Sequence, residues 1–195
     1  MDHTWVTDWQ KAPRSFAITN GMTVALPPEL VDRIIGAQGG HLYGSFAFQA
    51  FQLLFGRPTL NASTVNGYIE NPNHEAILHR VLDVYRNVIQ PVLDKTRMYH
   101  PTLTLDIPEP KGTGILERAH VCGDFTVFGV FQLADAPGIN QRFRLQGVDP
   151  SRDYRVTYLS NGHSCTVRGF DLSNDGIAIC LDGSLDAEAV VAIAL

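Results

Sequence analysis

Two tryptophans and a carboxylate lie close together near the amino terminus, in Trp5-Val-Thr-Asp8-Trp9, and Arg14 follows six residues after Asp8. Tryptophan rings pack well on the apolar face of a pyranose, so Trp5 and Trp9 are candidate sugar-binding residues. At positions i and i+4 of a strand they also share one face, which makes packing in a core equally possible. Asp8 could act chemically or serve as a turn or N-cap residue. Arg14 could clamp Asp8, bind a substrate hydroxyl or remain solvated.

Other common site chemistries lack their motifs in this sequence. His74 and His79 are five residues apart and do not share a helix face, so no metal site is predicted. No Gly-x-Ser-x-Gly sequence is present for a nucleophilic serine. The glycine-rich segment Gly36-Ala-Gln-Gly39-Gly40 lacks the Lys-Ser/Thr of a phosphate-binding loop. We therefore expect a protein without a metal or an organic cofactor.

The 195-residue chain carries a net charge of -5 and has no run of basic residues. Nucleic acids and anionic membranes bind clustered Lys and Arg, so neither is an expected partner, and a carbohydrate suits this surface better. No run of about 18 apolar residues, the length that indicates a transmembrane helix, is present. The amino terminus lacks the basic and apolar regions of a signal peptide, which predicts a cytoplasmic protein if Met1 is the natural start.

The three cysteines, Cys122, Cys165 and Cys180, have no metal-binding or redox spacing. Each lies in or beside a predicted strand, where a thiol behaves as a small apolar side chain. We expect all three to be reduced and packed in the core.

The carboxy-terminal half alternates short apolar runs with turn sequences such as Asn161-Gly162. Runs of this kind at a spacing of roughly ten residues predict an antiparallel β-sandwich. The predicted strands are Ile115–Val121, Phe125–Gln132, Gln141–Leu145, Tyr154–Tyr158, Cys165–Arg168, Gly176–Leu181 and Ala189–Ala194.

The amino-terminal half has helical patterns instead. Asn71 is a good N-cap with Pro72 at the first helical position, and an apolar stripe continues to Leu93 with a kink expected at Pro91. A second helix is predicted by the spacing of Phe48, Phe51 and Phe55. Shorter features are a strand at 4–9, a helical turn at 15–21 closed by Asn20-Gly21 and a short helix at 29–35. The Pro-rich segment from 99 to 111 predicts the boundary between two domains, 1–111 and 112–195.

The order of these features resembles the carboxy-terminal part of the α-galactosidase-type glycoside hydrolases, family 36 and its melibiase-like relatives. In that family a TIM barrel is followed by an antiparallel β-sandwich. The resemblance covers nearly the whole chain. Its motifs are Trp5-Val-Thr-Asp8 followed by Arg14, Phe55-Gly56, Val84-Tyr85-Arg86, and Leu145-Gln-Gly-Val-Asp-Pro150 with Tyr154-Arg-Val156.

The resemblance implies an α+β fold: the last units of a (β/α) barrel in 1–111, and a carboxy-terminal antiparallel β-sandwich in 112–195. It also implies that Asp8 is the acid/base of a retaining α-galactosidase, beside Trp5, Trp9 and Arg14 as substrate-binding residues. Retaining glycosidases need a second carboxylate as nucleophile. The family's Lys-x-Asp nucleophile motif does not precede Trp5, so we expect this chain to be inactive alone.

Two other functions remain open from the sequence. The chain could be a non-catalytic carbohydrate-binding or interaction module with the sandwich as its working part. It could also be an accessory subunit that completes a barrel on another chain. Apolar surface left uncovered on the helix that follows Asn71 would favour such a partner chain or a homo-oligomer.

Overall fold

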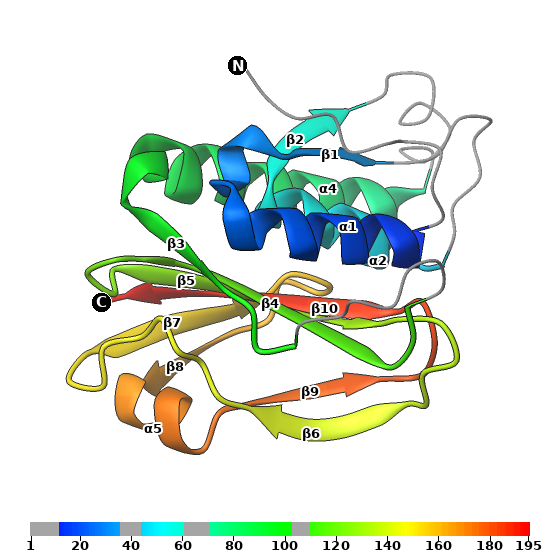
Figure 1. Cartoon of the computed structure of the whole chain (residues 1–195). Coiled ribbons are helices and arrows are strands. Elements are labelled where there is room, and N and C mark those ends of the chain that lie inside the picture. Colours follow the sequence, from blue (N-terminus) through cyan, green and yellow to red (C-terminus); the bar gives the residue numbers. More distant parts are fainter. Residues whose placement is uncertain (1–11, 36–43, 61–70, 103–109) are drawn as a thin grey trace.

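The computed structural model describes residues 12–35, 44–60, 71–102 and 110–195. These residues form three stacked layers (Figure 1). A six-stranded sheet lies in the middle, helices and a small parallel sheet cover one face, and a two-stranded sheet with a short helix covers the other. The layers therefore place helices and antiparallel strands on opposite sides of one central sheet.

The central sheet is antiparallel throughout, in the order β3-β4-β5-β10-β7-β8. All residues of β5 are buried, because both faces of this central strand are covered. Its strands are β3 (Thr96–Tyr99), β4 (Thr113–His120), β5 (Phe125–Gln132), β7 (Asp153–Tyr158), β8 (Ser164–Arg168) and β10 (Ala187–Ala194). Strand β3 lies before the predicted boundary at residue 111 yet pairs with β4 as an edge of this sheet.

The lower layer consists of β6 (Ile139–Phe143), β9 (Ile177–Leu181) and α5 (Gly169–Asn174). Apolar residues alternate along β9, so Ile177, Ile179 and Leu181 are buried and the residues between them are exposed. The sequence pattern predicted these strands correctly, since each predicted strand corresponds to one of β4 to β10. The antiparallel sheet is the part of the predicted fold that is confirmed.

The upper layer contains two short strands that run parallel, β1 (Asp32–Ile35) and β2 (Arg57–Leu60), with Asp32 opposite Arg57. Parallel neighbours need a crossover connection, and helical segments supply it here. These segments are α2 (Phe46–Ala50) and η2 (Phe51–Phe55), and before β1 come α1 (Ala12–Ala25) and the turn η1 (Pro28–Leu30).

The long helix begins where the sequence predicts. In α4 (Pro72–Val84), the Asn71 side chain accepts a hydrogen bond of 3.0 Å from the Asn73 N–H. The helix continues as the π-helical turn η3 (Tyr85–Ile89) and then as η4 (Gln90–Lys95), where Val92 has non-helical angles. The non-helical angles of Val92 confirm the predicted kink. Pro91 explains it, because proline has no N–H to donate to the preceding turn. No helix in the described part of the chain is long and apolar enough to span a membrane.

Two local predictions in the upper layer are wrong. Helix α1 runs through Asn20-Gly21 instead of ending there. Within the helix the Asn20 amide donates to the Thr102 carbonyl, and the Thr23 hydroxyl donates to the Thr19 carbonyl. The predicted helix at 29–35 is only the turn η1 followed by strand β1, in which Ile35 is fully buried.

Cys122, Cys165 and Cys180 are free, in agreement with the prediction, but the expectation that they pack in the core is wrong, because all three are exposed. Cys165 lies on β8, an edge strand whose residues are mostly exposed, and Cys180 lies on an outward-facing position of β9. The alternation of residues along a strand does not by itself tell which face of the strand is covered by another layer.

A large apolar core joins the helices to the central sheet. The ring of Phe131 on β5 lies 4.9 Å from that of Phe16, 5.6 Å from that of Phe48 and 5.9 Å from that of Phe55, measured between centroids. A second core, with Phe128 from the opposite face of β5, fills the space between the central sheet and β6–β9. The first core fixes the upper layer in place, and with it the segment that carries Arg14.

Candidate functional site

Of the four candidate site residues, only Arg14 lies among the residues that the structure describes. Trp5, Asp8 and Trp9 lie outside the described residues. Arg14 is half-buried in the first turn of α1. The described part of the candidate site is therefore this first turn and the groups that fix it.

The side chain that fixes this turn is Arg33, on β1. Its Nη1 donates to the Ser15 carbonyl at 3.1 Å, to the Ser15 hydroxyl at 2.7 Å and to the Thr19 hydroxyl at 2.6 Å. Arg33 is only 3% exposed. The residue immediately after Arg14 is thus tied to the parallel sheet by two hydrogen bonds.

The charge of Arg33 has no ion-pair partner among the described residues. Burial lowers the pKa of its guanidinium to about 9, because water no longer solvates the charge. Arg118 on β4 is equally buried, but its Nη2 lies 3.6 Å from a Glu29 carboxylate oxygen. Burial lowers the pKa of Arg118 to about 10, and Glu29 opposes that effect. Arg118 thus has a carboxylate beside its guanidinium, and Arg33 has none among the described residues.

Gly56 makes room for Arg33. A Cβ at this position, between η2 and β2, would lie 2.5 Å from Arg33 Cγ and 2.6 Å from the Val31 carbonyl oxygen. Any side chain here would displace the arginine stem. This contact gives a physical reason for glycine in the Phe55-Gly56 motif.

The other face of the parallel pair carries Asp32 and Arg57. Arg57 Nε lies 4.0 Å from Asp32 Oδ1, and the Asp32 side chain is 3% exposed while that of Arg57 is 49% exposed. The small sheet therefore has a buried arginine on its helix-facing side and a carboxylate on the other.

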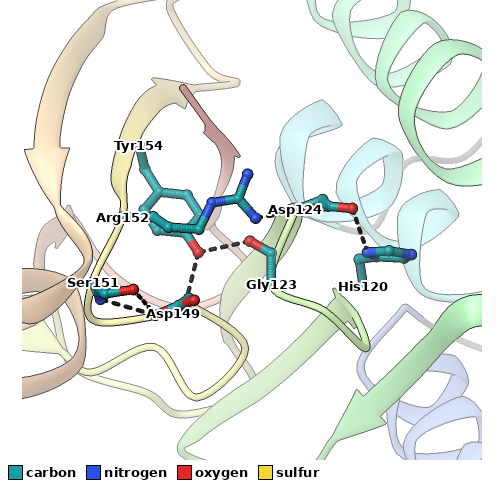
Figure 2. A network of polar contacts seen from close by, with 7 residues as sticks. All are labelled: His120, Gly123, Asp124, Asp149, Ser151, Arg152 and Tyr154. Carbon is teal, nitrogen blue, oxygen red and sulfur yellow. Dashed lines mark hydrogen bonds and ion pairs between the residues drawn. The ribbon is translucent and has the colours of Figure 1, made fainter.

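A second polar network lies in the sandwich, where two turns meet (Figure 2). The buried Tyr154 hydroxyl donates to the Gly123 carbonyl at 2.6 Å and accepts from the Asp149 N–H at 2.7 Å. Beside it, Arg152 donates to Asp124 at 2.7 Å, and this hydrogen bond is the main reason that the pKa of Asp124 is lowered. His120 Nδ1 lies 2.9 Å from the second Asp124 oxygen. These contacts connect the ends of β4, β5 and β7 and have the form of a structural lock.

The sandwich also contains a fully buried carboxylate, Glu117 on β4. Its oxygens accept hydrogen bonds from the Gly147 N–H at 2.7 Å, from the Gln146 N–H at 2.9 Å and from the Thr126 hydroxyl at 2.8 Å. Burial raises the pKa of Glu117, and these donors oppose the rise. Because each oxygen accepts a hydrogen bond, Glu117 holds the loop before β7 to the sheet.

Two hollows lie between the upper layer and the central sheet. One, of about 440 Å³, includes Thr23, Glu29 and His100, and burial lowers the pKa of that histidine. The other, of about 500 Å³, includes Lys95, His120 and Asp124. Neither of the two includes Arg14 or Arg33. Within the described ranges, no group of three or more His, Cys, Asp or Glu side chains could hold a metal ion.

Sequence reasoning missed Arg33 and Glu117. Arg33 was assigned to a helix, although the apolar Val31, Ile34 and Ile35 around it are the β-branched residues that favour a strand. Glu117 and Arg118 interrupt the apolar run that begins at Ile115, and such an interruption is a visible signal of buried charge. Two hydrogen-bonding partners of Glu117, the N–H groups of Gln146 and Gly147, lie about thirty residues away and could not be predicted from the pattern.

Comparisons of sequence alone gave no match, either to a protein-family model or to a curated protein. Solved structures did match. The family 36 α-galactosidase AgaA of Geobacillus stearothermophilus aligns over 100% of this chain and 26% of its own, with a TM-score of 0.73 and 16% identity. The α-galactosidase of Lactobacillus brevis aligns over 95% of this chain and 25% of its own, with a TM-score of 0.68 and 14% identity.

A putative α-N-acetylgalactosaminidase of Bacillus halodurans also aligns, with a TM-score of 0.54, 9% identity and coverage of 99% of this chain and 46% of its own. One AgaA variant was solved in complex with raffinose. The chain thus spans about a quarter of the length of the α-galactosidases that it matches. It has the fold of that quarter of a family 36 α-galactosidase, consistent with the carboxy-terminal part.

Proposed function

We propose that this chain works as the carboxy-terminal portion of a retaining α-galactosidase-like glycoside hydrolase. In this role it contributes the last strands of a catalytic barrel and the sandwich that supports them. Its substrate class is then an α-linked galactoside, and it is inactive without the rest of the barrel.

The observation that carries the proposal is the parallel pair β1–β2, with its helical crossover. Parallel strands occur almost only in sheets covered on both faces, and a two-stranded sheet is marginal by itself. Here the described helices cover one face, and the face with Asp32 and Arg57 has a half-exposed arginine. Further parallel strands beside β1 or β2 would complete a sheet of the barrel type.

Within this proposal, Asp8 is the acid/base and Arg14, Trp5 and Trp9 bind the sugar. Catalytic groups of barrel enzymes lie at the carboxyl ends of the strands. The predicted strand at 4–9 would bring Asp8 to such an end, just before α1. The nucleophile would come from a strand outside this chain.

A fusion protein tests the proposal. The present chain replaces the matching quarter of AgaA, and release of nitrophenol from nitrophenyl α-galactoside is measured. We expect activity in the fusion, none in the 195-residue chain alone, and a loss of at least about a hundredfold with Asp8→Asn. Activity of the isolated chain that Asp8→Asn abolishes would contradict the dependence on a separate barrel.

The same assay separates the accessory-subunit function from the fused one. The remaining three quarters of AgaA are supplied as a separate chain, and association is followed by analytical ultracentrifugation. Activity only on mixing identifies a chain that completes a barrel in trans. An inactive fusion that is folded and monomeric, together with galactose binding by the isolated chain, would instead identify a non-catalytic carbohydrate-binding module.

A further inference from the structure

Arg33 is a buried charge whose placement stability does not explain. We propose that Arg33 is a positioning residue that fixes the turn carrying Arg14, so that this turn presents its side chain to the sugar. The role of Arg14 rests on the function proposed above. The tie between Arg33 and the turn does not, and it can be tested separately.

The first argument is energetic. Removing a guanidinium from water is unfavourable unless a carboxylate and further hydrogen bonds compensate it. Arg33 has no carboxylate partner among the described residues, and its Nε is buried without a hydrogen-bond partner. An apolar side chain of similar length would avoid this penalty. The arginine therefore carries a desolvation cost that an apolar residue would not, as residues retained for function often do.

The second argument is geometric, because two segments, helix α1 and the junction between η2 and β2, are shaped around this side chain. Gly56 leaves space for the stem of Arg33, and Ser15 and Thr19 point their hydroxyls at its Nη1. Thr19 also donates to the Ser15 carbonyl at 3.0 Å. The result is a closed set of hydrogen bonds between β1 and the first turn of α1.

The third argument concerns the residue that these hydrogen bonds fix in place. Both the carbonyl and the hydroxyl of Ser15 are bound, and Ser15 follows Arg14 directly. The backbone from which the Arg14 side chain extends is thus fixed relative to the parallel sheet. A displacement of about 1 Å in a substrate-binding side chain is enough to lengthen its hydrogen bond to the sugar beyond the normal range and so to weaken substrate binding.

The first experiment uses the full 195-residue chain and compares Arg33→Met with Arg118→Met. Both changes remove a buried guanidinium, but only the second leaves a carboxylate, Glu29, without its partner. We expect the melting temperature to stay unchanged or to rise by roughly 2–4 °C in Arg33→Met, and to fall in Arg118→Met. Hydrogen exchange at residues 16–20 should become at least about tenfold faster in Arg33→Met, while α4 keeps the wild-type rates.

The second experiment places the same variants, and Arg33→Lys, in the fusion with AgaA. We expect Arg33→Met to raise KM about tenfold with kcat within about twofold, because substrate positioning is lost while the chemistry is intact. Arg33→Lys keeps the charge and one donor nitrogen in place of the three of the guanidinium, so its KM should lie between those of the wild type and Arg33→Met. Arg118→Met should leave KM unchanged at temperatures well below its melting point.

The outcomes separate the two proposals. Unchanged exchange at residues 16–20, or a fall in melting temperature in Arg33→Met equal to that of Arg118→Met, overturns the positioning role. An unchanged KM in an active Arg33→Met fusion overturns it as well. A folded but inactive wild-type fusion overturns the proposed function instead. The exchange rates at residues 16–20 then still test whether Arg33 fixes the first turn of α1.

Discussion

The two faces of the central sheet are covered in different ways. Below, β6, β9 and α5 close an antiparallel sandwich in which the buried Glu117 accepts hydrogen bonds on each oxygen. Above, the layer contains a two-stranded parallel sheet and the buried Arg33, which has no carboxylate partner among the described residues. Antiparallel sheets tolerate one solvated face, whereas parallel sheets need cover and neighbours.

The lower part therefore supplies hydrogen-bond donors for its own buried carboxylate, whereas the described residues of the upper part supply no carboxylate for the buried Arg33. The two parts nevertheless share β5, whose Phe131 faces up and Phe128 faces down. Variants that act on one face at a time can therefore test how independent the two parts are.

The largest expected effect comes from Phe131→Ala. It removes a fully buried ring that contacts Phe16, Phe48 and Phe55, so the free energy of unfolding should fall by about 3–5 kcal/mol. Chemical denaturation measures the loss. Hydrogen exchange should accelerate in α1 and α2 more than in β6 and β9.

Phe128→Ala is the matched control on the same strand. It should destabilise the protein by a similar amount but accelerate exchange in β6 and β9, because Phe128 packs against the lower layer, including Phe143. If both variants accelerate the same amides, the two cores do not behave as separate regions.

Glu117→Ala should have the next largest effect. It leaves the buried N–H group of Gly147 and the partly buried one of Gln146 without an acceptor, and we expect a loss of about 2–4 kcal/mol. Glu75→Ala, at an exposed site on α4, should change the stability by less than about 0.5 kcal/mol. Equal losses in the two variants would contradict the structural role of Glu117.

Tyr154→Phe tests the lock in Figure 2. It removes the hydroxyl that binds both the Gly123 carbonyl and the Asp149 N–H, and should lower the free energy of unfolding by about 1–3 kcal/mol. The control is Tyr158→Phe, whose hydroxyl makes one exposed hydrogen bond of 3.1 Å to the Ala178 carbonyl. A loss no greater than that of the control would show that the lock contributes nothing to stability.

The smallest effect is a pH dependence at Glu188. Burial raises the pKa of this carboxyl above 4.5, although the Ser160 hydroxyl donates to it. The neutral form is thus favoured in the folded state, so its contribution is complete below about pH 4.5 and is lost as the pH rises through the folded pKa. The melting temperature of Glu188→Gln relative to wild type should therefore increase from about pH 4.5 to pH 8. A flat difference would show that Glu188 is not desolvated in solution.

Local patterns were sufficient for much of the fold. The alternation in β9 and the turn at Asn161-Gly162 predicted the sandwich, and Asn71 with Pro72 predicted the start of α4. These signals depend on neighbouring residues only. The upper layer was harder, because the short strands β1 and β2 have four residues each and carry no clear period.

The candidate site was predicted only in part. The sequence singled out Arg14 and Gly56, and it proposed Asp8, Trp5 and Trp9, which lie outside the described residues. It gave no reason for the glycine and did not find Arg33. That reason is a contact between residues 23 positions apart, which only the packing of β1 against the start of β2 creates.

By itself, the sequence determined the alternation of strands, the long capped helix and the resemblance to family 36 α-galactosidases, because these depend on residue type and order along the chain. The tertiary structure alone decided which faces are covered. It exposed all three cysteines, buried Glu117 among donors that are mostly distant in sequence and buried Arg33 without a carboxylate partner in the described residues. Burial is set by elements distant in sequence, and the cost or benefit of a charge depends on what those elements place around it.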